Sequence, residues 1–183
     1  MIDPTARNHG LETVAAGGAV SVRPNLGFVN LRGDPGDHRF GETVEKVLGL
    51  PLPPEPNTFT AAGHRLYWLG PDEWLLVTDM GKARAVAADL RETLKRVRHA
   101  VNNVSGGYVS LQLDGPSARD LLACGCTLDL HPRVFGAGRC AQSSLAKASV
   151  LIGLVEPPDG FEIIVRRSFA DYLVRWLRGV SPG

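Results

Sequence analysis

The chain has 183 residues, 44% hydrophobic and 21% charged, which is enough to bury the core of a globular protein. Its formal net charge of +1 lacks the basic excess with which nucleic-acid-binding proteins neutralise phosphates. No run approaches the ~20 apolar residues of a membrane span, and three cysteines suit a reducing compartment better than a disulfide framework, so we expect a cytoplasmic protein.

The first half of the chain predicts a leader followed by short alternating elements. Residues 1–18 show no periodic apolar pattern and are expected to be flexible. The alternation over 19–33 predicts two short strands separated at Pro24. Residues 37–50 place apolar side chains on one helical face and stop at Gly49, so we expect a helix there.

Two strands and a second helix complete this half. Residues 57–70 and 73–79 are predicted strands, joined by a turn at 70–72. Residues 82–97 then repeat alanine, valine and leucine at helical spacing.

The second half repeats the same order. Residues 108–115 alternate as a strand, a short helix follows at 115–125, and 139–155 is predicted as one long strand after a loop. A strand at 161–167 and an amphipathic helix at 168–179 close the pattern.

The two halves also resemble each other in sequence. FVNLRGDPGD at 28–37 aligns with YVSLQLDGPS at 108–117, an offset of 80 residues, and GPDEWLLV aligns with PPDGFEIIV. Two copies cannot form a repeat array, so a duplicated unit is the simplest explanation. We predict an α+β fold of two strand–helix–strand–strand–helix halves, 19–100 and 101–180, packed as one compact unit.

The stretch GRCAQSSLAKASV at 138–150 combines a thiol, hydroxyls and cations, and so raises the question of a nucleophile. On a strand, Arg139 and Cys140 point to opposite faces, so the guanidinium would not activate the thiol. Ser143 and Ser144 lack the G-x-S-x-G elbow of a nucleophilic serine. A structural strand is therefore the better interpretation, and we expect no catalytic residue in this chain.

A metal site is considered for the cysteines and one histidine. These residues follow the spacing C-x-C-x4-H-x8-C, which is not one of the common zinc patterns: Cys124, Cys126, His131 and Cys140. We therefore expect no bound metal.

Several segments, in this order, resemble the gamma (small) subunit of heterotetrameric sarcosine oxidase. The strongest matches are GPDEWLLV at 70–77, GRCAQSSLAK at 138–147 and RRSFADYLVRWL at 166–177, supported by VSGGYVSLQLDGP and LLACGCTLDLHPRVF. The resemblance spans about residues 20–180 and rests on the ordered set of segments.

This resemblance implies the fold of the folate-binding aminomethyltransferase of the glycine cleavage system, the T-protein. It implies a complex that oxidatively demethylates sarcosine, passes the one-carbon unit to tetrahydrofolate and makes hydrogen peroxide. FAD, FMN, NAD and tetrahydrofolate would bind to partners among the alpha, beta and delta subunits, and no cofactor to this chain. Related complexes act on other N-methyl amino acids or as dehydrogenases, so the resemblance leaves the substrate open.

A stand-alone folate-binding aminomethyltransferase-like protein is the alternative. Such a protein usually needs an acidic residue over the folate pterin and a further C-terminal barrel. Asp34 and Asp114 are the acids available at strand ends, but each lies in a turn where aspartate commonly bonds its own backbone.

Under the subunit interpretation, the 138–150 strand and the terminal helix are expected to be buried by another subunit or by the other half. The single predicted strand carries Gln142 and Ser144 on one face and Arg139 and Lys147 on the other. The candidate subunit-interface residues are Arg139, Gln142, Ser144, Lys147, Tyr172 and Trp176. Arg139→Glu or Trp176→Ala is expected to weaken assembly more than turnover of the assembled complex.

Overall fold

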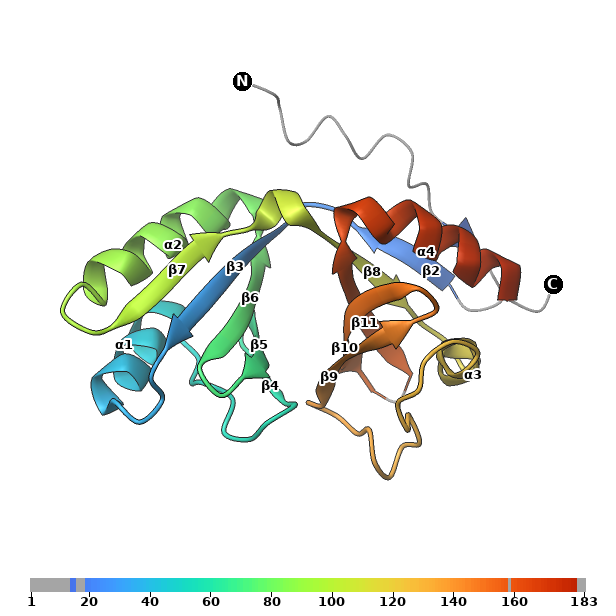
Figure 1. Ribbon diagram of the computed structural model, residues 1–183, viewed down its shortest axis with the longest axis horizontal. Helices are drawn as coiled ribbons and strands as arrows, with labels where there is room; N and C mark the ends of the chain where they lie inside the picture. Colours follow the sequence, from blue (N-terminus) through green and yellow to red (C-terminus); the bar gives the residue numbers. More distant parts are fainter. Residues whose placement is uncertain (1–13, 16–18, 158, 181–183) are drawn as a thin grey trace, which may run out of the picture. The chain divides into compact units, whose positions relative to one another are not determined.

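The computed structural model describes residues 14–15, 19–157 and 159–180 (Figure 1). The chain divides into two compact units, which we name the central unit (Asn25–Ser105) and the terminal unit (the residues up to Pro24 together with those from Gly106 onward). Except for β1 (Val14–Ala15), the predicted leader lies outside the described residues. No described helix has the length and apolarity needed to cross a membrane.

The central unit is a five-stranded antiparallel sheet in the order β4-β5-β6-β3-β7. Its elements, in chain order, are β3 (Leu26–Gly33), α1 (His38–Leu48), β4 (Phe59–Ala61), β5 (Arg65–Gly70), β6 (Glu73–Asp79), α2 (Met80–Thr93) and β7 (His99–Asn103). Both helices pack on one face of this sheet, as Figure 1 shows. The result is a β-α-β-β-α-β unit in which a short strand, β4, extends one edge.

Helix α1 shows how the predicted pattern becomes structure. The Asp37 side chain accepts the backbone N–H of Arg39 at its start, and Gly49, with φ of 69°, closes its last turn onto Glu45. Phe40, Val44 and Leu48 are buried on the face expected from their spacing.

The terminal unit is a six-stranded antiparallel sheet in the order β1-β2-β8-β11-β10-β9. Its elements after β1 are β2 (Ala19–Arg23), β8 (Tyr108–Leu113), α3 (Ala118–Ala123), β9 (Cys140–Leu145), β10 (Ala148–Glu156), β11 (Gly160–Arg166) and α4 (Arg167–Val180). The 3-10 turn Ser105–Gly107 precedes β8. Val109, Leu111 and Leu113 face the core that α3 and α4 cover, as their alternation predicts.

The duplication is clearest where a strand runs directly into a helix. β6 and α2 have 7 and 14 residues, and so do β11 and α4. In the central unit β7 follows α2 and pairs with β3, whereas in the terminal unit the corresponding place beside β8 is taken by β2. The sequence groups residues 19–100 together, but β2 comes from the N-terminal side of the central unit and completes the other sheet.

Three elements differ from the sequence predictions. Residues 57–70 form the β4–β5 hairpin instead of one strand, and β7 has no predicted counterpart. The predicted strand at 139–155 is the hairpin β9–β10, which turns at Ala146 with φ of 52°. Alanine rarely adopts this left-handed conformation, so the sequence carries no turn signal there.

Candidate subunit-contact surface

The side chains considered as nucleophiles have structural roles in the terminal unit. Cys140 is fully buried in β9. The Ser143 hydroxyl accepts the Cys126 thiol at 3.6 Å and donates to the Ser144 carbonyl at 3.4 Å. The partners of the Ser143 hydroxyl in these two bonds are a thiol and a backbone carbonyl.

The two acids considered for folate chemistry are also engaged locally. Asp34 Oδ1 accepts the backbone N–H of Gly36 at 2.8 Å, and Asp114 Oδ1 accepts Gln112 Nε2 at 2.7 Å. Asp34 therefore makes the local turn expected of it, while Asp114 is held by a neighbouring strand residue.

The described residues contain no group of three or more histidines, cysteines and acids that could hold a metal ion. Cys124 is exposed at the end of α3, whereas Cys126 and Cys140 are buried. His131 lies on an exposed connection between α3 and β9. Their positions in the structure thus do not produce a zinc ligand set.

A cavity of about 750 Å³ lies in the central unit between the ends of β3 and β7 and the β5–β6 turn. Its charges largely neutralise one another. Arg32 pairs with Asp72 at 2.7 Å, and Arg39 pairs with the lining residue Asp37 at 2.6 Å. The hydrogen bond from the Arg39 guanidinium holds the pKa of Asp37 below its usual value.

The fold lowers the pKa of His64. This histidine lies in the turn between β4 and β5, and burial lowers its pKa, with the Lys82 ammonium adding to the effect. Burial favours the neutral ring because the charged ring loses hydration.

The hairpin of β9 and β10 positions four of the predicted contact residues. Gln142 and Ser144 are exposed and lie on the face of the sheet that points away from the terminal core. Leu145 lies on the opposite face and is buried in that core. Arg139 is exposed just before β9. Lys147 lies in the hairpin turn, not on a strand face as the sequence predicts.

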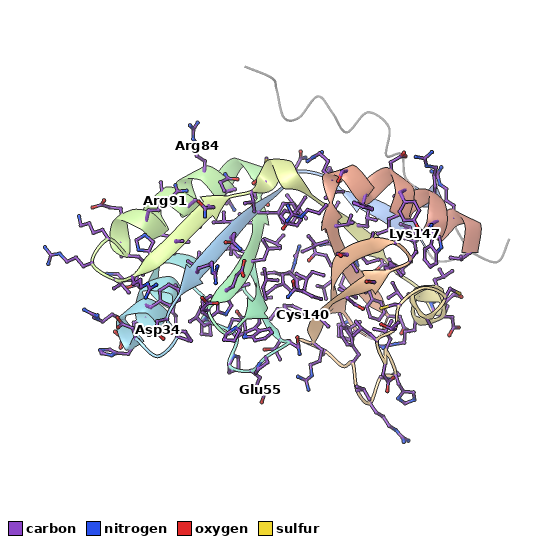
Figure 2. All side chains as sticks on the ribbon, viewed as in Figure 1. Asp34, Glu55, Arg84, Arg91, Cys140 and Lys147 are labelled. Atoms are coloured by element: carbon purple, nitrogen blue, oxygen red, sulfur yellow. The ribbon has the colours of Figure 1, made fainter. Side chains whose placement is uncertain are left out.

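The hairpin turn lies against helix α4. The backbone N–H of Lys147 donates to Tyr172 Oη at 3.3 Å, and Figure 2 shows Lys147 beside α4. Tyr172 and Trp176 are half-buried and pack against the terminal core. Phe169 is 42% exposed and meets the Tyr172 ring edge-on, with ring centroids 6.4 Å apart.

These aromatic residues follow the spacing i, i+3 and i+7, so they form a stripe along one side of α4. We name the group Lys147, Phe169, Tyr172 and Trp176 the α4 surface. It unites three of the six predicted contact residues and adds Phe169, which its exposure identifies. Gln142 and Ser144 lie on the opposite sheet face, so the six residues do not form a single patch.

Gly125 permits the close packing of Trp176. A Cβ at this position would lie 2.6 Å from both Cζ2 and Cη2 of the Trp176 ring, and 3.1 Å from the backbone nitrogen of Ala146. That nitrogen donates to the Gly125 carbonyl at 2.9 Å, which fixes the hairpin turn beside the ring. The role of Gly125 has no signal in the sequence, because Trp176 and Ala146, which approach it, lie 51 and 21 residues away along the chain.

Gly125→Ala is expected to lower the free energy of unfolding by about 1–3 kcal/mol, because the added methyl group must displace the Trp176 ring or the hairpin turn. Urea titration gives the size of the loss, and the Trp176 environment is followed by near-UV circular dichroism. Gly106→Ala is the control, since nothing lies within 4 Å of a Cβ there. An unchanged near-UV spectrum in Gly125→Ala would contradict this packing.

Comparison with known proteins identifies the family. The sarcosine oxidase, gamma subunit family (SoxG) matches residues 32–182. The gamma subunit of sarcosine oxidase from Corynebacterium sp. (strain P-1) is 33% identical over 176 residues, covering 92% of this chain and 85% of that protein. The Arthrobacter sp. gamma subunit is 32% identical, with the same coverage of both chains.

Solved structures agree with these sequence matches. A chain of heterotetrameric sarcosine oxidase from Corynebacterium sp. U-96, in complex with pyrrole 2-carboxylate, superposes with a TM-score of 0.83 at 31% identity, covering 98% of this chain and 93% of that one. Aminomethyltransferase T of the Bartonella henselae glycine cleavage system superposes with a TM-score of 0.65 at 19% identity, covering 88% of this chain and 45% of that one. The second likeness confirms the predicted fold.

The stand-alone transferase interpretation is not supported. An aminomethyltransferase from Saccharopolyspora erythraea is 33% identical over only 100 residues, and the match covers 27% of that protein. The gamma-subunit matches extend over most of both chains, and the predicted resemblance is confirmed. The chain belongs to the sarcosine oxidase gamma subunit family.

Proposed function

We propose that this chain is the non-catalytic gamma subunit of a heterotetrameric, flavin-dependent complex that oxidatively demethylates sarcosine or a related N-methyl amino acid. The observation that carries the proposal is the superposition on heterotetrameric sarcosine oxidase over nearly the full length of both chains. Its role is to support the assembly and stability of the complex, in which tetrahydrofolate accepts the one-carbon unit.

In this proposal, the redox chemistry takes place in the partner subunits. Alpha, beta and delta subunits hold FAD, FMN, NAD and tetrahydrofolate, and this chain contributes protein surface. The local engagement of Asp34, Asp114 and Ser143 supports this division, because each of these groups serves a turn, a strand or a neighbouring thiol.

The α4 surface is the proposed contact with a partner subunit. Tyrosine, tryptophan, phenylalanine and cationic side chains are enriched where proteins bind one another, since they combine a large apolar area with a polar end. Trp176 also packs on Gly125, so Trp176→Ala weakens the chain itself. Phe169→Asp is the better test of contact, because Phe169 is 42% exposed and absent from the terminal core.

Native mass spectrometry tests the proposal on the full chain, expressed alone and together with flavoprotein subunits of a sarcosine oxidase complex. We expect a flavin-containing hetero-oligomer with the partners, and no flavin or folate retained by the lone chain. Phe169→Asp is expected to lower the yield of the complex while its turnover per assembled complex stays near that of the wild type. A lone chain that binds tetrahydrofolate and ignores the flavoproteins would overturn the proposal.

A further inference from the structure

The connection between α3 and β9 is long, yet it is firmly attached to the terminal unit. Residues 127–138 form no helix or strand, and connections longer than about 12–15 residues are uncommon in compact proteins, where they are usually either functional or disordered. Leu130 and Phe135 enter the terminal core, where they are 5% and 6% exposed. Between these two anchors, residues 131–134 are all exposed. We name them the 131–134 tip.

A single guanidinium holds both ends of the tip. Nη1 of Arg119 donates to the carbonyl of Leu130 and, at 3.4 Å, to that of Phe135. Its Nε donates to Asp159 at 2.8 Å, and the group lies 5.1 Å from the centre of the Phe161 ring. The Arg119 side chain is 14% exposed, so these bonds are shielded from water.

Hydrogen bonds within the connection also fix the backbone of the tip. The N–H groups of Val134 and Phe135 both donate to the His131 carbonyl, at 2.8 and 2.9 Å. Asp129 Oδ1 accepts the N–H of His131 at 2.9 Å, which closes an Asx turn before the tip. The tip is therefore held in one conformation without contributing a side chain to the core.

The 131–134 tip exposes an apolar side chain, Val134, next to a cationic one, Arg133. Val134 is 54% exposed, and the other large hydrophobic side chain exposed in the described residues is Phe169. Arg133 is exposed, and no carboxylate of the described part of the chain pairs with it. A lone exposed valine is ordinary, but a valine and an unpaired arginine on a clamped turn form a preorganised binding element.

We infer that the 131–134 tip docks into a partner subunit that offers an apolar pocket for Val134 and a carboxylate for Arg133. This inference rests on the proposed function and adds a second contact, independent of the α4 surface. A clamped tip loses little conformational entropy on binding, and arginine is enriched among the residues that carry binding energy at protein interfaces. One valine and one cation are too few to hold the chain on a lipid surface.

The test measures the affinity of the full chain for its flavoprotein partners by titration followed with native mass spectrometry. Val134→Asp and Arg133→Glu are each expected to raise the dissociation constant at least tenfold. Both side chains are exposed, so the melting temperature of the lone chain is expected to stay within about 2 °C. Arg84→Glu, a matched charge reversal at an exposed position of α2 seen in Figure 2, is the control and is expected to change neither quantity.

The outcomes separate this inference from the proposed function. Docking of the tip is supported if the wild-type chain assembles, the tip variants bind the partners more weakly, and Arg84→Glu binds them as the wild type does. Wild-type assembly with unchanged tip variants overturns the docking inference and leaves the subunit proposal standing. Failure of the wild-type chain to assemble overturns both. A homodimer of the lone chain that the tip variants abolish would assign the tip to a second copy and overturn the partner stated here.

Discussion

Arg119→Met is expected to lower the free energy of unfolding of the chain by about 2–4 kcal/mol. The methionine keeps much of the aliphatic length but removes every bond of the guanidinium. Asp159 loses its ion-pair partner, and the carbonyls of Leu130 and Phe135 lose a charged donor. Partly buried groups left without partners are costly because water does not fully replace the lost bonds.

Urea denaturation of the full chain measures this loss, and hydrogen exchange localises it. Faster exchange is expected first in residues 130–135 and α3, which the guanidinium joins. Arg175→Met is the matched control, since Arg175 pairs with Asp171 on the exposed side of α4, where both side chains are more than 60% exposed. That variant is expected to lie within about 0.5 kcal/mol of the wild type. Equal losses in the two variants would show that the Arg119 clamp contributes nothing beyond a surface ion pair.

Local sequence patterns predict the elements that bury side chains on one regular face. The spacing of Phe40, Val44 and Leu48 predicts α1, and the alternation of Val109, Leu111 and Leu113 predicts β8, because each element buries a regular face. β7 gives no such pattern. It reads HAVNN, with only Val101 buried, and its pairing with β3 depends on contacts about 70 residues away in sequence.

The sequence also predicts only part of the α4 surface. Tyr172 and Trp176 are predicted from helical spacing, and the structure brings Lys147 to them through a hydrogen bond between residues 25 apart in sequence. The prediction that Lys147 lies on a strand face is wrong. Ala146 adopts a left-handed turn conformation, which an alanine in the sequence does not predict. The Arg119 clamp is not readable from sequence at all, because Asp159 lies 40 residues away.

Gly33→Ala is expected to lower the free energy of unfolding by about 2–3 kcal/mol through a steric conflict inside the central core. Its sequence context, GDPGD, suggests a turn, but the structure gives another reason for glycine. A Cβ at Gly33 would overlap Cε2 and Cζ of the Phe40 ring and lie 2.6 Å from Cδ2. Phe40 is fully buried and packs on Trp74 with ring centroids 5.6 Å apart, so the ring has no free space to enter.

The backbone cannot easily relieve this conflict, because Gly33 donates its N–H to the Asp72 carbonyl at 3.1 Å. Gly41→Ala is the control: its added methyl group meets only Leu52 at 3.9 Å, and alanine favours a helix by up to about 1 kcal/mol, so no loss is expected. Combining Gly33→Ala with Phe40→Leu removes the overlapping ring atoms, and the double variant is expected to lose less than the sum of the two single losses. Strict additivity in urea titrations would mean that Phe40 is not what excludes a side chain at Gly33, and that the strand yields elsewhere.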